Sequence, residues 1–581
     1  MPAFSAASRR RFLPTLSGVG LGSSLLPGIL WAQMAESGKL ELTTAMIQQA
    51  AALAGLSFTP DQCAELINTV SDNLGRYEEL HAISVPNDVA PPFYFSPIVA
   101  GMTVDRIAAP VRFSSPSAPS RPANLEDLAF ASVLNLAALI KSSTVTSVEL
   151  TRMFLIRLRR LNSKLNCVVT FLDDLAFAQA KTADAEIAAG HYRGPLHGIP
   201  WGAKDIIAVA GYKTTWGSGA YQDQEFAEDA TVTRLLREAG AVLIAKLTTG
   251  ELAGGNVWFG GRTNNPWKLD QGSSGSSAGP ASATAAGCVP FSIGSETSGS
   301  IFSPSSRCGA TGLYPTFGRV SRVGVMALSW TQDRLGPICR YVEDCAVVIQ
   351  AITPPDSLDL AMQDIPFNWD ATADWRNLRI GYLEDAFADT DRNPAWIRHD
   401  RATLNTLREM GADLIPLRVP EVQGLDTLRL SAESAVFFDD MLRSGRDPLL
   451  TVQSKAARYR AARLIPAVEY QQSQRIRAII MAKLSEATAK VDVYVAPYGT
   501  GLPRHRPPAG TPRPPPNATS RHTTMANLAT YPGIALPNDF TSDGTPSSIT
   551  FMGRPYGEAA VMSLAKAYQD ATTHHLKQPA L

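Results

Sequence analysis

The chain has 581 residues, and its apolar fraction of 45% is sufficient to bury a large core in one large domain or two ordinary ones. Its 53 basic and 53 acidic residues cancel, so no net charge favours binding to nucleic acid or to an anionic membrane. Its cysteines form no Cys-x-x-Cys pair and its histidines show no metal-ligand spacing, so the sequence predicts neither a metal site nor a redox motif.

The first 32 residues have the features of an export signal. The segment Ser8-Arg9-Arg10-Arg11-Phe12-Leu13 matches a twin-arginine motif, and a Gly/Ser/Leu-rich apolar run follows it up to Ala32. Glycine and proline interrupt this run, which makes it a poor membrane-spanning helix. The sequence therefore predicts a signal over 1–32 and a periplasmic or secreted mature protein without stable membrane insertion. A disordered basic tail and an uncleaved anchor are the alternatives.

Residues 33–110 are predicted to form an N-terminal helical hairpin. Apolar residues recur at helical spacing in two stretches of 42–85, and Thr59-Pro60 between them is typical of a helix start. The two apolar stripes contain Met46, Ile47, Ala50, Leu53 and Ala54 in the first helix, and Cys63, Leu66, Ile67, Val70, Leu74, Tyr77 and Leu80 in the second. Both stripes need a partner surface, which the rest of the chain can supply.

A Ser/Pro-rich linker is predicted over 111–123, followed by a catalytic domain over 124–581. We expect its first helices near 125–141 and 146–160, the second with a capping box formed by Thr146 and Glu149. Further on, helical segments alternate with apolar runs that predict strands at 241–245, 289–293, 378–382, 491–495 and 533–537. This alternation predicts an α/β fold in which helices cover both faces of a sheet.

Two Ser/Gly-rich loops lie close together between residues 265 and 319. The loops are 272–279 (Gly-Ser-Ser-Gly-Ser-Ser-Ala-Gly) and 294–300 (Gly-Ser-Glu-Thr-Ser-Gly-Ser), and they bracket a small-residue helix and an apolar strand. Flexible linkers share this composition, but a linker would not alternate with segments apolar enough to be core. We therefore interpret the loops as a functional site carried on rigid elements.

The stretch 265–319 closely resembles the amidase signature family, in its Asn-Pro-Trp element, its two Ser/Gly loops and its final Cys-Gly…Pro-Thr…Gly-Arg segment. The segment 198–205, Gly-Ile-Pro-Trp-Gly-Ala-Lys-Asp, is similar to the family's Gly-Ile-Pro…Lys-Asp element, and the resemblance continues nearly to the C-terminus. It implies the amidase signature fold, a large mixed β-sheet sandwiched between helices. It also implies similarity to the A subunit of glutamyl-tRNA(Gln) amidotransferase, while the N-terminal hairpin resembles the C subunit or is an ordinary helical hairpin.

The resemblance implies a catalytic triad without metal or cofactor: Ser300 as nucleophile, Ser276 as a bridging serine in a cis peptide bond, and Lys204 as base. The oxyanion hole would be formed by the backbone N–H groups of Thr297, Ser298, Gly299 and Ser300. A serine hydroxyl needs a base at neutral pH, and a lysine can act as one only where burial without a paired carboxylate keeps it neutral. Asp205 is adjacent, but successive side chains of an extended segment point to opposite faces, so it need not neutralise Lys204.

Several positions depart from the family pattern. Ala278 and Ser298 replace glycines, and Glu296 stands where aspartate is usual. Phe302 replaces an arginine, and Arg307 compensates for it if both positions reach the same carboxylate. A side chain at 298 also constrains the backbone of the oxyanion loop. The remaining serines are interpreted as structural: Ser273, Ser274, Ser295 and Ser303, with Ser277 as support for the site.

The first functional hypothesis is an exported amidase that hydrolyses a small-molecule carboxylic amide, or an ester, through an acyl-enzyme. A glutamine-dependent amidotransferase A subunit fits an export signal poorly, because charged tRNA is cytoplasmic. A non-catalytic binding protein would not need the intact triad. Specificity would depend on the loop 256–259, the helical region 430–470 and the Pro/Arg-rich loop 502–516, which is either near the substrate entrance or disordered. Neither the substrate nor the oligomeric state follows from the sequence.

Overall fold

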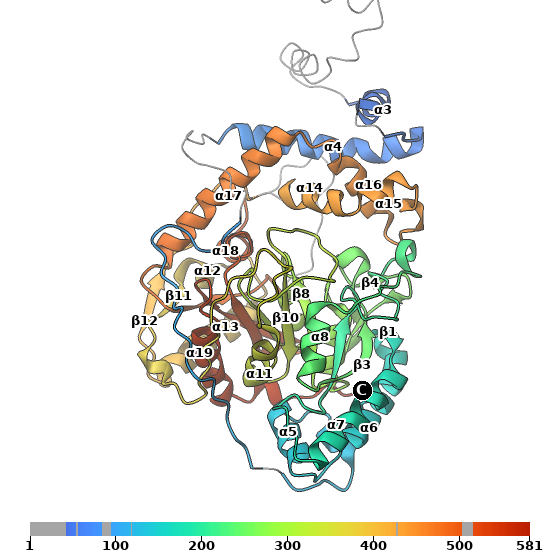
Figure 1. The fold of residues 1–581 in the computed structure, drawn as a ribbon. Helices are drawn as coiled ribbons and strands as arrows, with labels where there is room; N and C mark the ends of the chain where they lie inside the picture. The colour runs from blue at the N-terminus through green and yellow to red at the C-terminus, as the bar shows by residue number, and fades with distance from the viewer. Residues whose placement is uncertain (1–41, 54–55, 84–94, 118, 426–427, 502–514) are drawn as a thin grey trace, which may run out of the picture.

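The computed structural model describes residues 42–581 except 54–55, 84–94, 118, 426–427 and 502–514 (Figure 1). The predicted export signal over 1–32, Ala54 and most of the loop 502–516 lie outside the described residues. Within the described ranges, no helix is both long enough and apolar enough to cross a membrane.

An eleven-stranded mixed sheet forms the centre of the molecule. Its strands, in spatial order, are β1 (Val168–Phe171), β3 (Val242–Leu247), β2 (Pro200–Lys204), β8 (Phe291–Glu296), β10 (Arg334–Cys339), β9 (Thr311–Tyr314), β14 (Gly533–Phe540), β15 (Pro546–Gly553), β13 (Val493–Pro497), β11 (Ile380–Leu383) and β12 (Leu414–Leu417). Strand β2 is parallel to β3 and β8, and β11 is parallel to β12 and β13, whereas the other neighbours are antiparallel. This is the large mixed sheet that the sequence predicted.

Helices cover both faces of the sheet. Along β13, Val493 and Val495 belong to one apolar core and Tyr494 and Ala496 to the other, because alternate side chains of a strand point to opposite faces. Helices α11 (Val342–Ile352) and α19 (Glu558–Asp570) contribute to the first core, and α10 (Phe302–Cys308) and α18 (Ala518–Leu528) to the second. The predicted sandwich of helices around a sheet is therefore confirmed.

The predicted helix over 125–141 is wrong in one respect, because it is two segments. A 3-10 helix η2 (Leu125–Leu128) precedes α5 (Val133–Lys141), and Ser132 starts the second helix by accepting the Asn135 N–H at 3.1 Å. The next helix, α6 (Ser147–Leu165), begins with the predicted Thr146/Glu149 capping box. The five predicted strands are present as β3, β8, β11, β13 and β14, each starting within two residues of the expected position.

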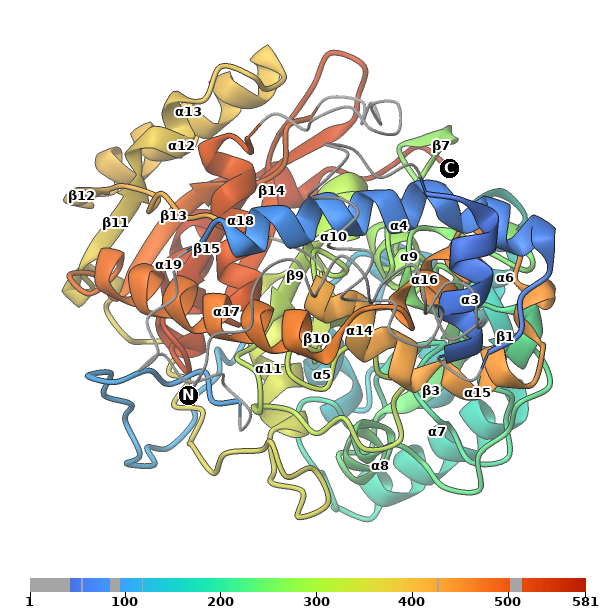
Figure 2. The same cartoon turned by 90° about the horizontal axis from the view of Figure 1, so that it is seen from above.

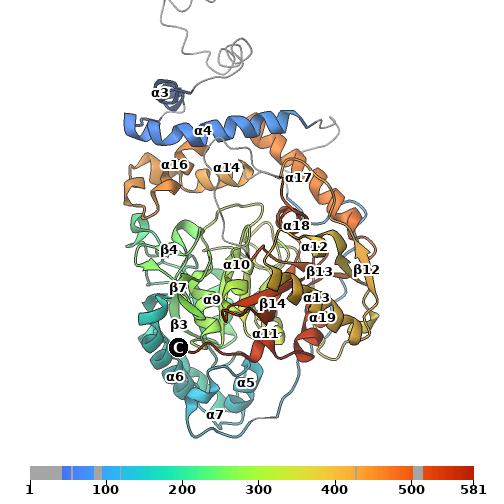
Figure 3. The ribbon, with the colours of Figure 1, turned by 180° about the vertical axis from the view of Figure 1, so that it is seen from behind.

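The N-terminal hairpin packs on a layer of helices at one end of the molecule. Helix α3 (Thr44–Leu53) precedes α4 (Pro60–His81). Thr59 caps α4 as predicted, since its hydroxyl accepts the Gln62 N–H at 3.3 Å, and the Gln62 side chain accepts the Thr59 N–H at 2.9 Å in return. A group that we call the helical arm consists of α14 (Leu428–Phe437), α15 (Asp439–Arg443), α16 (Gln453–Ala462) and α17 (Ala467–Ala487). Helix α4 lies across α16 and α17, and the arm separates it from the sheet (Figures 1, 2 and 3). Ile47, Cys63 and Leu66 pack against Ala461 of the arm.

The predicted linker 111–123 is attached to the surface of the domain that contains the sheet. The Arg112 amide donates to the Trp369 carbonyl at 2.9 Å, and the Ala371 amide donates to the Arg112 carbonyl at 2.9 Å. The Ser114 amide donates to the Glu343 carboxylate at 2.7 Å. These contacts fix the start of the segment against the domain that contains the sheet.

Candidate active site

The parallel pairing of β2 and β8 brings the predicted site residues to one edge of the sheet. Lys204 is the last residue of β2, and Glu296 is the last residue of β8, so the loop that contains Ser300 begins beside Lys204. Ser276 lies just before α9 (Ala278–Ala285) and follows a cis peptide bond from Gly275. The carboxyl ends of parallel strands are where binding sites commonly form in α/β folds.

Lys204 is fully buried and contacts two serine hydroxyls. Its Nζ lies 2.7 Å from the Oγ of Ser276 and 2.8 Å from the Oγ of Ser295. No carboxylate in the described part of the chain forms an ion pair with it. Burial lowers the pKa of Lys204 to about 7, against the negative charges of Glu296 and Asp333, which raise it. The amine is therefore neutral in an appreciable fraction of molecules near neutral pH and can accept a proton.

Asp205 points away from Lys204, as the alternation along an extended segment predicted. Its carboxylate lies 3.1 Å from the Nζ of Lys246, a fully buried residue of β3, and accepts the Thr215 N–H at 3.0 Å. Lys246 also donates to the Ile207 carbonyl and to the Thr214 hydroxyl, both at 2.7 Å. The Asp205 carboxylate therefore has its own cation.

Ser300 is joined to the Ser276 turn through the backbone. The Ser277 N–H donates to the Ser300 carbonyl at 3.1 Å, whereas the Ser300 hydroxyl has no hydrogen-bond partner among the described residues. Ser277 also supports the site as predicted, because its Oγ accepts the Ser295 N–H at 3.1 Å and donates to the Ser295 carbonyl at 3.2 Å. Of the predicted triad, Lys204 and Ser276 are in direct contact, and Ser300 lies on the adjoining loop.

One of the four predicted oxyanion donors is engaged elsewhere. The Gly299 N–H donates to the Glu296 carboxylate, which also accepts the N–H groups of Ile301 at 2.6 Å and Phe302 at 3.3 Å. Among the described residues, the amides of Thr297, Ser298 and Ser300 have no acceptor. The predicted set is therefore reduced to these three, because Glu296 folds back over its own loop.

The proposed compensation between Phe302 and Arg307 is wrong. Phe302 is buried with its ring 4.0 Å from that of Tyr314, and Arg307 is exposed. In the described structure the Glu296 carboxylate is hydrogen-bonded to backbone amides alone and needs no arginine.

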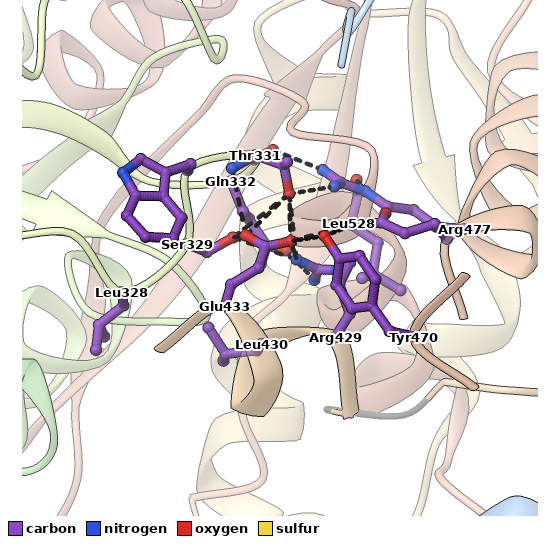
Figure 4. A network of polar contacts seen from close by, with 12 residues as sticks. Leu328, Ser329, Thr331, Gln332, Arg429, Leu430, Glu433, Tyr470, Arg477 and Leu528 are labelled. Atoms are coloured by element: carbon purple, nitrogen blue, oxygen red, sulfur yellow. Dashed lines mark hydrogen bonds and ion pairs between the residues drawn. The ribbon is translucent and has the colours of Figure 1, made fainter. Parts of the chain in front are cut away.

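Sequence reasoning missed three side chains at the site. Ser295, interpreted as structural, contacts the Lys204 amine. Gln332 donates to the Thr297 carbonyl and, at 3.2 Å, to the Ser298 Oγ. Arg429 of α14 donates to the Gln332 side-chain oxygen, as part of a polar network between the arm and the sheet (Figure 4). Gln332 lies within a stretch similar to the family, but no local pattern indicates its distant partners.

A cavity of about 270 Å³ adjoins Ser295 and Thr297. Most of its wall is apolar and includes Ala253, Met326, Leu328, Trp330, Leu335 and Phe437. Two of its charged residues form an ion pair, Arg322 with Asp359 at 2.9 Å. The other two are hydrogen-bonded, since Asp333 accepts the Thr297 hydroxyl at 2.6 Å and Arg334 donates to the Asn527 side chain at 2.8 Å. Among the regions expected to determine specificity, the helical region 430–470 supplies Phe437, whereas 256–259 does not line the cavity.

Comparisons with known proteins agree with this architecture. Residues 149–562 match the family described as Amidase. The A subunit of glutamyl-tRNA(Gln) amidotransferase from Roseiflexus sp. (strain RS-1) is 34% identical over 472 residues, which cover 75% of this chain and 95% of that relative. The "Amidase" of Pseudomonas putida is 32% identical over 459 residues, covering 77% and 97%. The solved structure of native peptide amidase from Stenotrophomonas maltophilia aligns with a TM-score of 0.66 and 29% identity, covering 76% of this chain and 97% of the peptide amidase. The chain therefore belongs to the amidase signature family.

Proposed function

We propose that this member of the family hydrolyses carboxylic amides with Ser300 as nucleophile, Ser276 as proton relay and Lys204 as base. The observation that carries the proposal is the environment of Lys204, whose buried amine contacts two serine hydroxyls and forms no ion pair within the described residues. Such an amine can deprotonate a hydroxyl at neutral pH.

In the proposed reaction, the Ser300 oxygen bonds to the amide carbon while its proton passes to Ser276, whose own proton passes to Lys204. The tetrahedral adduct collapses with cleavage of the carbon–nitrogen bond, and the amine leaves with the proton returned from Lys204 through Ser276. Water then attacks the acyl-enzyme by the same route and releases the carboxylic acid. Backbone amides of Thr297, Ser298 and Ser300 would stabilise the oxyanion. An ester substrate would give the same acyl-enzyme.

We further propose that the substrate carries an uncharged, apolar group on its acyl side. The cavity beside Ser295 and Thr297 has a mostly apolar wall, and its charged groups are hydrogen-bonded to other residues of the protein. Its lining includes two large apolar residues with exposed side chains, Trp330 at 46% and Leu358 at 73%. Apolar cavities with a few fixed polar groups are typical of small-molecule sites.

The test is labelling of the purified protein with a fluorophosphonate probe and mapping of the modified peptide, with Ser300→Ala as the control. Attachment at Ser300 that disappears in the variant is the expected result, and turnover should then favour amides with apolar acyl groups over charged ones. A folded protein that does not react at Ser300 would exclude this nucleophile and support a non-catalytic binding role.

An amidotransferase A subunit is the second candidate, because a relative with that name is 34% identical. Free glutamine carries both an ammonium and a carboxylate group at neutral pH, whereas the wall of the cavity is mostly apolar. Ammonia release from glutamine distinguishes the two functions. We expect less release from glutamine than from an apolar primary amide, and the reverse order would favour the amidotransferase.

We also propose export through the twin-arginine motif, with the mature protein periplasmic or secreted. The motif at 8–13 and the apolar run after it support this proposal. Cell fractionation of the wild type and of an Arg9→Lys/Arg10→Lys variant is the test. Retention of the variant in the cytoplasm is expected, and equal export of both proteins would contradict the proposal.

A further inference from the structure

The peptide that joins Thr297 to Ser298 is held from one side by Gln332. This side chain is buried, and its Nε2 donates to the Thr297 carbonyl and, at 3.2 Å, to the Ser298 hydroxyl. The carbonyl of Thr297 and the N–H of Ser298 belong to the same planar trans peptide, so they point in opposite directions. A donor that holds the carbonyl therefore turns the Ser298 N–H to the other side of the loop, where no described residue accepts it.

Arg429 fixes which way the Gln332 amide faces. The Arg429 guanidinium contacts the Gln332 side chain at Oε1, and a guanidinium has only donors. Gln332 must therefore present its oxygen to Arg429 and its nitrogen to the loop. Arg429 is buried on α14, so the helical arm determines the donor direction at the loop.

The arm holds Arg429 in a network of buried polar groups (Figure 4). Glu433, one helical turn further on, lies 3.6 Å from the Arg429 guanidinium. Its carboxylate also accepts hydrogen bonds from the hydroxyls of Ser329 at 2.5 Å, Thr331 at 3.0 Å and Tyr470 at 3.2 Å. Ser329 and Thr331 lie just before Gln332 in sequence, so the network holds both Arg429 and the segment that carries Gln332.

We propose that Gln332 is a positioning residue that orients the Thr297–Ser298 peptide, so that the Ser298 N–H serves as an oxyanion donor, and that Arg429 holds Gln332 in the effective orientation. The inference rests on the proposed amide hydrolysis. It also accounts for a serine at 298, where the family has glycine, because the Ser298 hydroxyl gains a contact with Gln332. Neither side chain is assigned contact with substrate.

The test compares Gln332→Met and Gln332→Glu with the wild type in kcat, KM and inhibitor affinity. Methionine removes the donor, and glutamate places an oxygen against the Thr297 carbonyl. Loss of one oxyanion donor lowers kcat about 100- to 1000-fold, so we expect an indirect loss of at least about tenfold with little change in KM. A trifluoromethyl ketone forms an oxyanion on binding, so the affinity of the variants for it should fall in parallel with kcat. Their affinity for the carboxylic acid product should be unchanged.

Two further variants separate positioning from a purely structural role. Arg429→Lys keeps a charge beside Glu433 but shortens the reach to Gln332, and it should show the same kcat loss in milder form. Gln569→Met is the matched control, because Gln569 is also a buried glutamine but contacts Thr311 and Arg340 far from this network, and its kcat should stay at the wild-type level. Thermal unfolding verifies that each variant is folded.

Three results would overturn the inference. Folded Gln332→Met and Arg429→Lys variants with wild-type kcat would show that the orientation of the peptide does not depend on Gln332. A rise in KM at constant kcat would place Gln332 in substrate binding. Absence of fluorophosphonate labelling at Ser300 in the wild type would overturn the proposed function and this inference together, whereas a labelled wild type with fully active variants overturns this inference alone.

Discussion

Lys204 and Lys246 are both fully buried, on the neighbouring parallel strands β2 and β3. Ala203 pairs with Lys246 and Lys204 with Leu247, so the two lysines are one position apart in register. Lys246 has a carboxylate 3.1 Å away, a carbonyl and a hydroxyl. Lys204 has two serine hydroxyls. Two chemically identical side chains with equal burial thus have different partners.

The difference indicates that the partner, and not burial, separates a structural cation from a candidate base. Burial lowers the pKa of both amines, and at Lys246 the charge of Asp205 opposes this shift directly. The amine of Lys204 lacks a carboxylate in contact, which leaves its pKa at about 7. A buried ion pair is poor evidence for stability by itself, but breaking it leaves an isolated charge, which is costly.

The largest effect is expected from Lys204→Met. Removal of the proposed base should lower kcat for amide hydrolysis about 10⁴- to 10⁶-fold, as for members of known catalytic triads. The fold should persist, because methionine fills a similar volume without an amine to desolvate. Ammonia release and thermal unfolding measure the two properties. Turnover within tenfold of the wild type would assign the base to another residue.

Lys246→Met should affect stability instead. The substitution leaves the Asp205 carboxylate buried without its cation, and breaking such a pair costs about 3–5 kcal/mol in the free energy of unfolding. Chemical denaturation measures this loss. The double variant Asp205→Asn/Lys246→Met removes both charges and should recover much of it. If the double variant were no more stable than Lys246→Met, the lost stability would not come from the unpaired charge.

The place of Lys204 at the candidate site and the direction of the Asp205 side chain could be predicted from the sequence. The Gly-Ile-Pro…Lys-Asp element indicated Lys204, and strand alternation indicated that Asp205 would face elsewhere. The Thr146/Glu149 capping box and the five strands could likewise be predicted, because each depends on residues that are close together in the sequence. Such signals are reliable because the physics that they depend on, alternation, capping and apolar runs, is itself local.

The partners of Lys246 could not be predicted, because they depend on contacts between segments that are distant in sequence. Lys246 became a partner of Asp205 only through the parallel register of β2 and β3. The sequence does show a lysine directly after the apolar run 241–245. It does not show which side chain lies next to that lysine in the folded sheet. Gln332 and Arg429 meet only through the packing of the helical arm against the loop that precedes β10.

Ser295→Asp should convert Lys204 into a residue like Lys246. Ser295 borders the cavity, which leaves room for a carboxylate next to the amine. An opposite charge at this distance shifts a pKa by about 1–3 units in favour of the charged form, so the pKa of Lys204 should rise by that amount. Activity at pH 7 should fall and recover at higher pH. Ser295→Asn, which has the same shape without charge, is the control, and a similar profile for both variants would contradict this reasoning.

The pH profile of the wild type is the mildest test of the comparison. Since the pKa of Lys204 is about 7, its ammonium form predominates below that pH and cannot accept a proton. Glu296 on β8 and Asp333 before β10 are the charged groups that influence it, and both favour the ammonium form. We expect kcat/KM to rise about tenfold between pH 6 and pH 8 and then to level off, as for one essential base. A midpoint near pH 10 would show that Lys204 is as protonated as an ordinary lysine. In that case the serine hydroxyls around it would not distinguish it from Lys246.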